Sequence, residues 1–305
     1  MLIGDFFAGI GGFHLAFNEL GVGCEYACEI DDYVRRTYNH NFNVARFDYD
    51  ITKVKDLPDF DIFCGGFPCQ PFSMAGLRKG IEDDRGKVFL DILRILKDKK
   101  PRAFLLENVK GLLSHEKGAT YAWMEEQLSN LGYNVFGKVL NTAEHGNIPQ
   151  NRERIFIVGL LNSNTFEFPE AIPLTTKIRD FITEEDVDEK LYYENNAVYP
   201  ELKKHITSKD TMYQWRRTYV RENKSKECPT LTANMGTGGH NVPLILTYDN
   251  RIRKLTPREC LNFQGYPDNY EFTPKLSNTR AYYQAGNSIT VPVVKRIAEK
   301  ILKYM

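Results

Sequence analysis

Short apolar runs alternate with segments of helical spacing through the first half of the chain, and this alternation limits the fold more than any other feature. We expect strands at residues 2–7, 24–29, 60–64, 103–106 and 154–160, and helices at 13–20, 88–97 and 123–131. Strands separated by helices form βαβ units, so the pattern predicts an α/β class with a parallel, Rossmann-like sheet. Ligands in such sheets bind at the carboxyl ends of the strands.

The alternation stops after residue 161, and residues up to about 255 are polar and irregular. Helical spacing returns between 256 and 305, most clearly at 293–304. We therefore expect a first domain at 1–165, completed by 275–305, and a second, smaller domain at 166–274. The chain has no apolar run long enough to cross a bilayer and no secretory leader pattern, so we expect a soluble, cytoplasmic protein.

A glycine-rich string, DFFAGIGG at residues 5–12, follows the first expected strand. Its glycines permit positive φ angles and a close approach of a ligand to the backbone. The dinucleotide-binding pattern GxGxxG would need a glycine at position 14, which is His14. The string thus predicts a nucleotide loop of another type, and a plain turn between strand and helix is the alternative.

Acidic residues follow the next two apolar segments of the chain. Glu29 ends the second expected strand, where a carboxylate accepts hydrogen bonds from ribose hydroxyls. Asp50 is placed to accept from an adenine amino group, with Ile51 packing on the ring. For Glu29 a solvated acid at the end of a strand is the alternative.

The string GGFPCQPFS at residues 65–73 follows the expected strand at 60–64. Pro68 and Pro71 flank the Cys69-Gln70 pair and stiffen the loop, so Cys69 is held like a nucleophile. A buried, inert cysteine is the alternative. None of the six cysteines belongs to a CxxC pair, so we expect neither a disulfide framework nor a metal site.

Charge is balanced over the whole chain, with 40 Lys and Arg against 40 Asp and Glu, but it is segregated. Residues 180–201 carry eight acids and one lysine. Residues 203–258, which we call the basic segment, carry twelve Lys and Arg against four acids, a net charge of +8. Such a segment favours a nucleic-acid partner, and an unevenly charged surface is the alternative.

At this point a family resemblance covers the chain nearly end to end. The sequence resembles a bacterial C5-cytosine DNA methyltransferase of the restriction–modification type. Five strings carry the likeness in the family's order: PCQ at 68–70, ENV at 107–109, QNRER at 150–154, REC with GYP at 258–260 and 265–267, and GNS at 286–288. The resemblance implies S-adenosylmethionine as cofactor, double-stranded DNA as partner, a monomer, and pairing with a restriction endonuclease.

The resemblance also implies roles for individual residues. Cys69 would add to carbon 6 of a flipped cytosine, and Glu107 would act as an acid near ring N3. Arg154 would contact the base, while Arg152 would grip a phosphate or brace the loop. We expect these two arginines, at the start of a strand, to point to opposite faces.

Phe7 would stack on the adenine of the cofactor, and Asn287 would lie near its amino-acid end. The full set expected at the cofactor is Asp5, Phe7, Ala8, Gly9, Gly11, Gly12, Glu29, Ile30, Asp50, Ile51, Gly66, Pro68, Asn287 and Ser288.

In this family the irregular region sets the DNA sequence that is recognised, so 166–274 becomes the expected target-recognition domain and hinge. Its Thr230-Leu231-Thr232 string resembles the family's recognition motif, and arginines suit phosphates or guanine edges. The residues expected to contact DNA are Gln70, Ser73, Arg85, Arg216, Arg217, Thr230, Thr232, Thr237 and His240.

Three other functions fit parts of the pattern. The first is an RNA methyltransferase on the same scaffold, although the Cys-Phe-Thr string typical of tRNA-methylating members is missing. The second is a nicotinamide dehydrogenase, against which His14 argues. The third is a DNA-binding homologue without activity, against which the presence of Cys69 and Glu107 argues.

Overall fold

The computed structural model describes residues 1–68, 84–237 and 243–305. The chain divides into two units, which are described separately. The first comprises residues 1–140, 153–170 and 293–305, and the second comprises 141–152 and 171–292. In the described part of the chain, no helix is long and apolar enough to cross a membrane.

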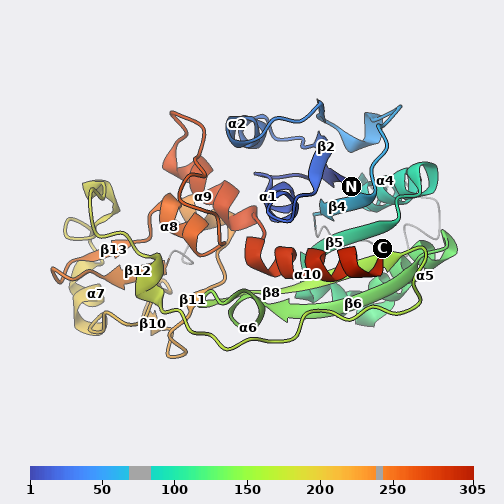
Figure 1. The fold of residues 1–305 in the computed structure, drawn as a ribbon. Coiled ribbons are helices and arrows are strands. Elements are labelled where there is room, and N and C mark those ends of the chain that lie inside the picture. The colour runs from blue at the N-terminus through green and yellow to red at the C-terminus, as the bar shows by residue number, and fades with distance from the viewer. Residues whose placement is uncertain (69–83, 238–242) are drawn as a thin grey trace. The chain divides into compact units, whose positions relative to one another are not determined.

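The first unit is built on a seven-stranded sheet in the order β3-β2-β1-β4-β5-β8-β6, which Figure 1 shows running from blue through green. Its strands are β1 (Leu2–Phe6), β2 (Gly23–Cys28), β3 (Arg46–Asp48), β4 (Ile62–Gly66), β5 (Ala103–Val109), β6 (Asn134–Asn141) and β8 (Glu153–Leu160). Strand order reverses at β1, between β2 and β4, so the carboxyl end of β1 lies at a topological switch point where α/β sheets bind ligands.

The strands β1, β4, β5 and β8 of this sheet are almost wholly buried, which explains their long apolar runs. On one face Phe63, Phe104 and Ile157 pack into a cluster with Phe89 and Ile92 of the helix that follows β4. The helices of the unit are α1 (Gly12–Asn18), α2 (Asp32–Asn41), α4 (Asp84–Lys99), α5 (Ala119–Asn130) and the part of α10 (Val291–Tyr304) from residue 293, with short 3-10 turns at Ile51–Lys53, Lys110–Leu113 and His115–Gly118.

The expectation of a parallel sheet is wrong at β8, which runs antiparallel to β5. Helix α5 leads into β6, but no helical crossover of that length follows β6. Only the short α6 (Thr142–Gly146) separates β6 from β7 and β8. The reversal places the start of β8 opposite the end of β5, with Arg154 paired to Val109 in register. Sequence strings from the end of one strand and the beginning of another therefore meet at one sheet edge.

The second unit contains a four-stranded sheet in the order β10-β9-β12-β13 and a two-stranded parallel pair, β11-β7. Its strands are β7 (Gln150–Asn151), β9 (Tyr213–Trp215), β10 (Val220–Glu222), β11 (Cys228–Pro229), β12 (Pro243–Leu246) and β13 (Ile252–Lys254). Its helices are α6, α7 (Tyr199–His205), α8 (Pro257–Asn262) and α9 (Asn278–Asn287), with 3-10 turns at Ile178–Phe181, Glu189–Leu191 and Ala233–Thr237.

The two units differ from the expected domain limits at three places, one of which is residues 166–170, expected in the second domain and found in the first unit. Residues 141–152 and 275–292 belong to the second unit, although they were expected in the catalytic domain. The reason is packing: β7 pairs with β11, and the side chain of Thr142 hydrogen-bonds that of Thr290 across 2.9 Å. These partners are distant in sequence, so the sequence pattern held no signal for them.

Candidate active site

Glu107 and Arg154 form an ion pair at the edge where β5 ends and β8 begins. The Nε of Arg154 lies 2.9 Å from Oε1 of Glu107, and the two side chains are only 18% and 11% exposed. Glu107 is paired in register with Gly66 on its other side. A side chain at position 66 would approach Oε2 of Glu107 to 3.3 Å, so glycine there leaves room beside the carboxylate.

Asn108 holds the backbone just before Cys69 by a hydrogen bond. Its Nδ2 donates to the backbone oxygen of Phe67 across 3.0 Å, and its side chain is buried. The structure therefore places Phe67 and the exposed Pro68 beside the Glu107–Arg154 pair. Sequence reasoning gave Asn108 no separate role, although an amide within a buried strand indicates a specific hydrogen-bonding partner.

Several predicted residues lie outside the described part of the chain. They are Cys69, Gln70, Ser73 and His240, together with the side chain of Arg85, whose backbone belongs to α4. Their roles stay predictions.

Arg152 is a buried positioning residue in this structure. Its guanidinium donates to the backbone oxygens of Leu231, across 3.0 Å, and Ser288, across 2.6 Å. We expected Arg152 and Arg154 to point to opposite faces of a strand. That expectation rested on a wrong premise, because residues two apart on a strand share a face. Arg152 and Arg154 have different partners because Arg152 precedes β8 and lies outside it. These contacts support the bracing role for Arg152.

The glycine-rich string turns sharply after β1, as its composition predicts. Gly9 and Gly11 have φ angles of 54° and 82°, and Phe7 also has a positive φ, of 53°. An added Cβ at Gly11 would lie 2.4 Å from the ring of Phe42, whereas at Gly9 it would meet only a backbone oxygen at 3.9 Å. Gly9 and Phe7 are the half-buried positions of the string, and the surface above Gly9 is open.

The other predicted residues of the string lie inside the unit. Asp5, Ala8, Gly11 and Gly12 are buried, and both carboxyl oxygens of Asp5 are without a hydrogen-bond partner in the described residues. Burial raises the pKa of Asp5 well above its usual range, which the nearby backbone N–H of His14 offsets only in part. These buried residues therefore support the backbone of the loop from the interior of the unit.

Glu29 holds the loop from the adjacent strand end. Its Oε2 accepts from the backbone N–H of Gly9 and its Oε1 from that of Asp31, each across 2.9 Å. Burial raises the pKa of Glu29, and these two hydrogen bonds oppose that shift. The same carboxylate that was expected at a ribose thus also orders the backbone of the glycine-rich string.

Asp50 caps the short 3-10 turn at Ile51–Lys53. Its Oδ1 accepts from both the backbone and the hydroxyl of Thr52, and this bonding, together with nearby Lys53, lowers the pKa of Asp50. Ile51 is buried in the hydrophobic core, so its surface is already covered. Ile30, by contrast, is 73% exposed.

Asn287 and Ser288 lie at the end of α9 in the second unit, whereas the glycine-rich string lies in the first. Asn287 is exposed, and the hydroxyl of Ser288 donates to the backbone oxygen of Ala285 across 2.8 Å. Their predicted contact with the cofactor stays a prediction.

His14 gives the first unit a testable pH dependence. It hydrogen-bonds the hydroxyl of Tyr38 across 2.8 Å, and burial lowers the pKa of His14 from 6.5 to about 4. Between these values the unfolded chain binds a proton that the folded chain excludes, so stability should fall as the pH falls from 6.5 to 4. The slope from this residue reaches about 1.4 kcal/mol per pH unit. Denaturant unfolding of His14→Gln should show a shallower pH dependence in this window, and parallel curves would contradict the assignment.

The predicted recognition residues of the second unit are mostly engaged in local hydrogen bonds. The hydroxyl of Thr230 donates to the backbone oxygen of Asn151, that of Thr232 to Oδ1 of Asn234, and that of Thr237 to the backbone oxygen of Asn234. Arg217 is exposed with a φ of 64°. Arg216 is half-buried and lines a pocket that also contains Thr230 and Thr232.

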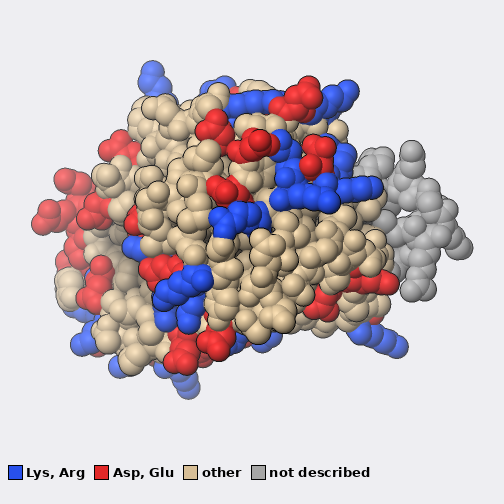
Figure 2. Space-filling model, turned by 45° about the vertical axis from the view of Figure 1, so that its right-hand side comes forward, with Lys and Arg blue, Asp and Glu red and all other residues tan. Residues whose placement is uncertain are grey.

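Sequence reasoning missed several residues of that pocket, above all Gln214 and Arg221. These two residues meet because β9 and β10 form a hairpin that pairs Arg221 with Gln214. On the face seen in Figure 2, Lys and Arg side chains are interspersed with Asp and Glu. Among the described residues, no three His, Cys, Asp or Glu side chains gather as metal ligands would.

The chain was compared with known proteins. The family model described as C-5 cytosine-specific DNA methylase matches residues 1–303. The Type II methyltransferase M.Bsp6I of Bacillus sp. (strain RFL6) is 50% identical, over 99% of each chain. M.HhaI of Haemophilus parahaemolyticus, also a Type II methyltransferase, is 38% identical over 97% of this chain and 93% of its own.

Among solved structures, the Dnmt2 methyltransferase of S. pombe superposes with a TM-score of 0.80 at 24% identity, over 99% of this chain and 98% of its own. That likeness shows the fold alone. The family match over nearly the whole chain agrees with the order of its sequence strings and with the α/β sheet that carries them. The chain belongs to the family of C-5 cytosine-specific DNA methylases.

Proposed function

We propose that this enzyme transfers a methyl group from S-adenosylmethionine to carbon 5 of a flipped cytosine in a specific short duplex DNA site. The Glu107–Arg154 pair carries the proposal, because it lies where the chain enters the Cys69 segment. Two relatives are named Type II methyltransferases, so we further propose that the methylation protects host DNA from a cognate restriction endonuclease.

The proposed chemistry assigns one step to each residue. Carbon 5 of cytosine is too weak a nucleophile to take a methyl group unaided. The Cys69 thiolate adds to carbon 6, while Glu107 donates a proton to ring N3, so that electron density moves to carbon 5. Arg154, held by Glu107, donates to the cytosine O2. After methylation a base removes the proton from carbon 5, the thiolate is eliminated, and the N3 proton returns to the Glu107 carboxylate, which restores the ring.

Residues at the carboxyl edge of β1 and β2 fit the cofactor. The open surface above Gly9 and the exposed Ile30 leave room for a flat ring, and Glu29 lies between them at the end of β2. When bound, S-adenosylmethionine supplies an electrophilic methyl group on its sulfonium. We propose that Glu29 binds its ribose and that Asp50 and Ile30 contact its adenine.

The target base is inaccessible within a duplex, so the enzyme must flip it out at a cost of a few kcal/mol. Contacts from the second unit to phosphates and base edges would supply that energy. We therefore propose that the recognition residues, including Thr230 and Thr232, bind duplex DNA around the flipped nucleotide.

The test is transfer of labelled methyl groups to duplex DNA, followed by bisulfite sequencing of DNA from an expressing host. We expect 5-methylcytosine at one short site. Duplexes with 5-fluorocytosine at that site should trap a covalent complex with the wild-type protein and not with Cys69→Ser. Methylation of tRNA instead of DNA, or unchanged methylation by Cys69→Ser, would contradict the proposal.

A further inference from the structure

A pocket in the second unit collects cationic side chains around the β9–β10 hairpin. Its volume is about 650 Å³, and all its lining residues belong to this unit. Three of them are cations, Arg216, Arg221 and Lys224, against a single acid, Glu222. The pocket is therefore built for a ligand that is rich in hydrogen-bond acceptors.

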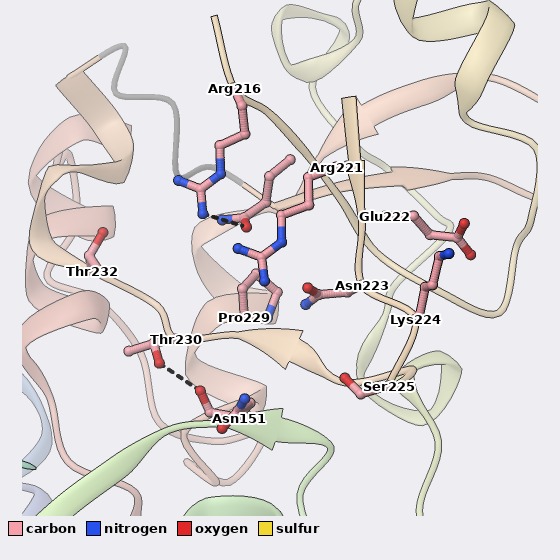
Figure 3. Close-up of a pocket in the computed structure, with 11 residues that line it drawn as sticks. Asn151, Arg216, Arg221, Glu222, Asn223, Lys224, Ser225, Pro229, Thr230 and Thr232 are labelled. Atoms are coloured by element: carbon pink, nitrogen blue, oxygen red, sulfur yellow. Dashed lines mark hydrogen bonds between the residues drawn. The ribbon is translucent and has the colours of Figure 1, made fainter. Parts of the chain in front are cut away.

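The two arginines are held differently. Arg216 donates from Nη2 to Oε1 of Gln214 across 3.2 Å, and Gln214 is only 3% exposed, so the buried amide orients the guanidinium. Arg221 is the cross-strand partner of Gln214 and is exposed. Among the described residues Arg221 forms no ion pair. Figure 3 shows both guanidinium groups projecting into the same space above Pro229.

The acid of the lining does not neutralise this pair. Glu222 follows Arg221 directly on β10, so the two side chains leave opposite faces of the strand. In Figure 3 Glu222 lies beside Lys224, away from the arginines. Arg216 and Arg221 thus place two like charges in one pocket, and a ligand with hydrogen-bond acceptors would lower their mutual repulsion.

The pocket is also tied to the QNRER string. Strand β11 pairs with β7, and the Thr230 hydroxyl donates to the backbone oxygen of Asn151 across 2.6 Å (Figure 3). Oε1 of Gln150 accepts from the backbone N–H of Leu231, and Arg152 donates to the backbone oxygen of the same residue. The pocket wall is therefore fixed to the segment that leads into β8.

We propose that Arg221 and Arg216 read a guanine of the target site, through donation to its O6 and N7 in the major groove, and that Gln214 positions Arg216 for this contact. The inference rests on the proposed DNA substrate. A guanine edge presents two adjacent acceptors that match an oriented guanidinium fork, whereas a phosphate makes no demand on sequence. The oriented guanidinium of Arg216 in a concave pocket therefore favours the base edge.

The experiment measures kcat/KM on the methylation site and on every duplex that differs from it by one base pair. Arg221→Lys keeps the charge and removes the fork, so discrimination at one G·C pair should fall by about 5- to 150-fold. Discrimination at the other positions and the salt dependence of binding should stay as in the wild type. Gln214→Leu should relax the same or the adjacent position, and Gln214→Glu, which keeps the acceptor for Arg216, should restore it.

Two results would overturn the inference. A uniform loss across all duplexes for Arg221→Ala, with the salt slope reduced by about 0.9, would identify a phosphate contact. Unchanged discrimination in Arg221→Lys and Gln214→Leu would exclude the pocket from recognition. Lys190→Ala serves as the control, since this exposed cation of the same unit lies outside the pocket. If the wild-type protein methylates no DNA, the proposed function fails instead.

Discussion

Replacement of Glu259 by alanine is expected to destabilise the second unit by about 3–5 kcal/mol, because it leaves a buried cation without its partner. Glu259 and Arg253 are both fully buried, and two hydrogen bonds of 2.8 and 2.9 Å join their side chains. Glu259 also accepts from the backbone N–H groups of Thr256 and Thr183, across 2.7 and 2.8 Å. One carboxylate thus closes the capping box of α8 and holds the backbone at Thr183.

Urea unfolding followed by circular dichroism measures this loss. Glu189→Ala provides the control, since it breaks an exposed ion pair with Arg251 in the same unit and should leave the midpoint nearly unchanged. Arg253→Met combined with Glu259→Leu should recover much of the loss, because an apolar pair of similar volume needs no neutralising partner. Equal midpoints for Glu259→Ala and Glu189→Ala would show that the buried pair contributes little.

Replacement of Glu107 by glutamine is expected to lower kcat for DNA methylation by about 10²- to 10⁴-fold, the usual contribution of a positioned general acid. The amide oxygen of glutamine still accepts from Nε of Arg154, so the local packing should be retained. The variant cannot donate the same proton to the cytosine ring. Single-turnover methylation at saturating DNA and cofactor measures the effect, and DNA affinity should stay within a few-fold of the wild type.

Lys110→Ala is the matched control for this measurement. Lys110 pairs with Glu153 at the same edge of the sheet, where both side chains are largely exposed. Its loss should leave kcat near the wild-type value. A Glu107→Gln enzyme with wild-type kcat would remove Glu107 from the chemistry, and a parallel loss of folding would reassign it to structure.

Much of the first unit could be predicted from the sequence because its strands are buried on both faces. Continuous apolar runs mark such strands, and β1, β2, β4, β5 and β8 all lie at or near the expected positions. The direction of β8 could not be predicted, because an apolar run looks the same in a parallel and in an antiparallel strand. The sequence also contains no signal for the hairpin-like return from β6. The meeting of Glu107 with Arg154 follows from that direction.

The part of the second unit between residue 171 and about residue 255 was predicted only as irregular. Its strands are two to four residues long, which is too short for an alternation of apolar and polar residues to be visible. The REC string matched the family without a physical explanation, and the structure shows that Glu259 is a buried partner of Arg253. Arg152 was expected to grip a phosphate or to brace the loop, and its contacts with Leu231 and Ser288 support the bracing role.

By itself, the sequence determined the class of fold, the family and the chemical types of the residues at the candidate site, because apolar periodicity and motif order are local properties of the chain. The tertiary structure alone decided which of those residues meet. Arg154 contacts Glu107 because β8 is antiparallel, Glu29 bonds the loop at Gly9 because β2 lies beside β1, and Arg221 faces Gln214 because β9 and β10 form a hairpin. In each contact, the number of residues between the two partners does not indicate how close they lie in space. Strand pairing depends instead on burial summed over the whole sheet.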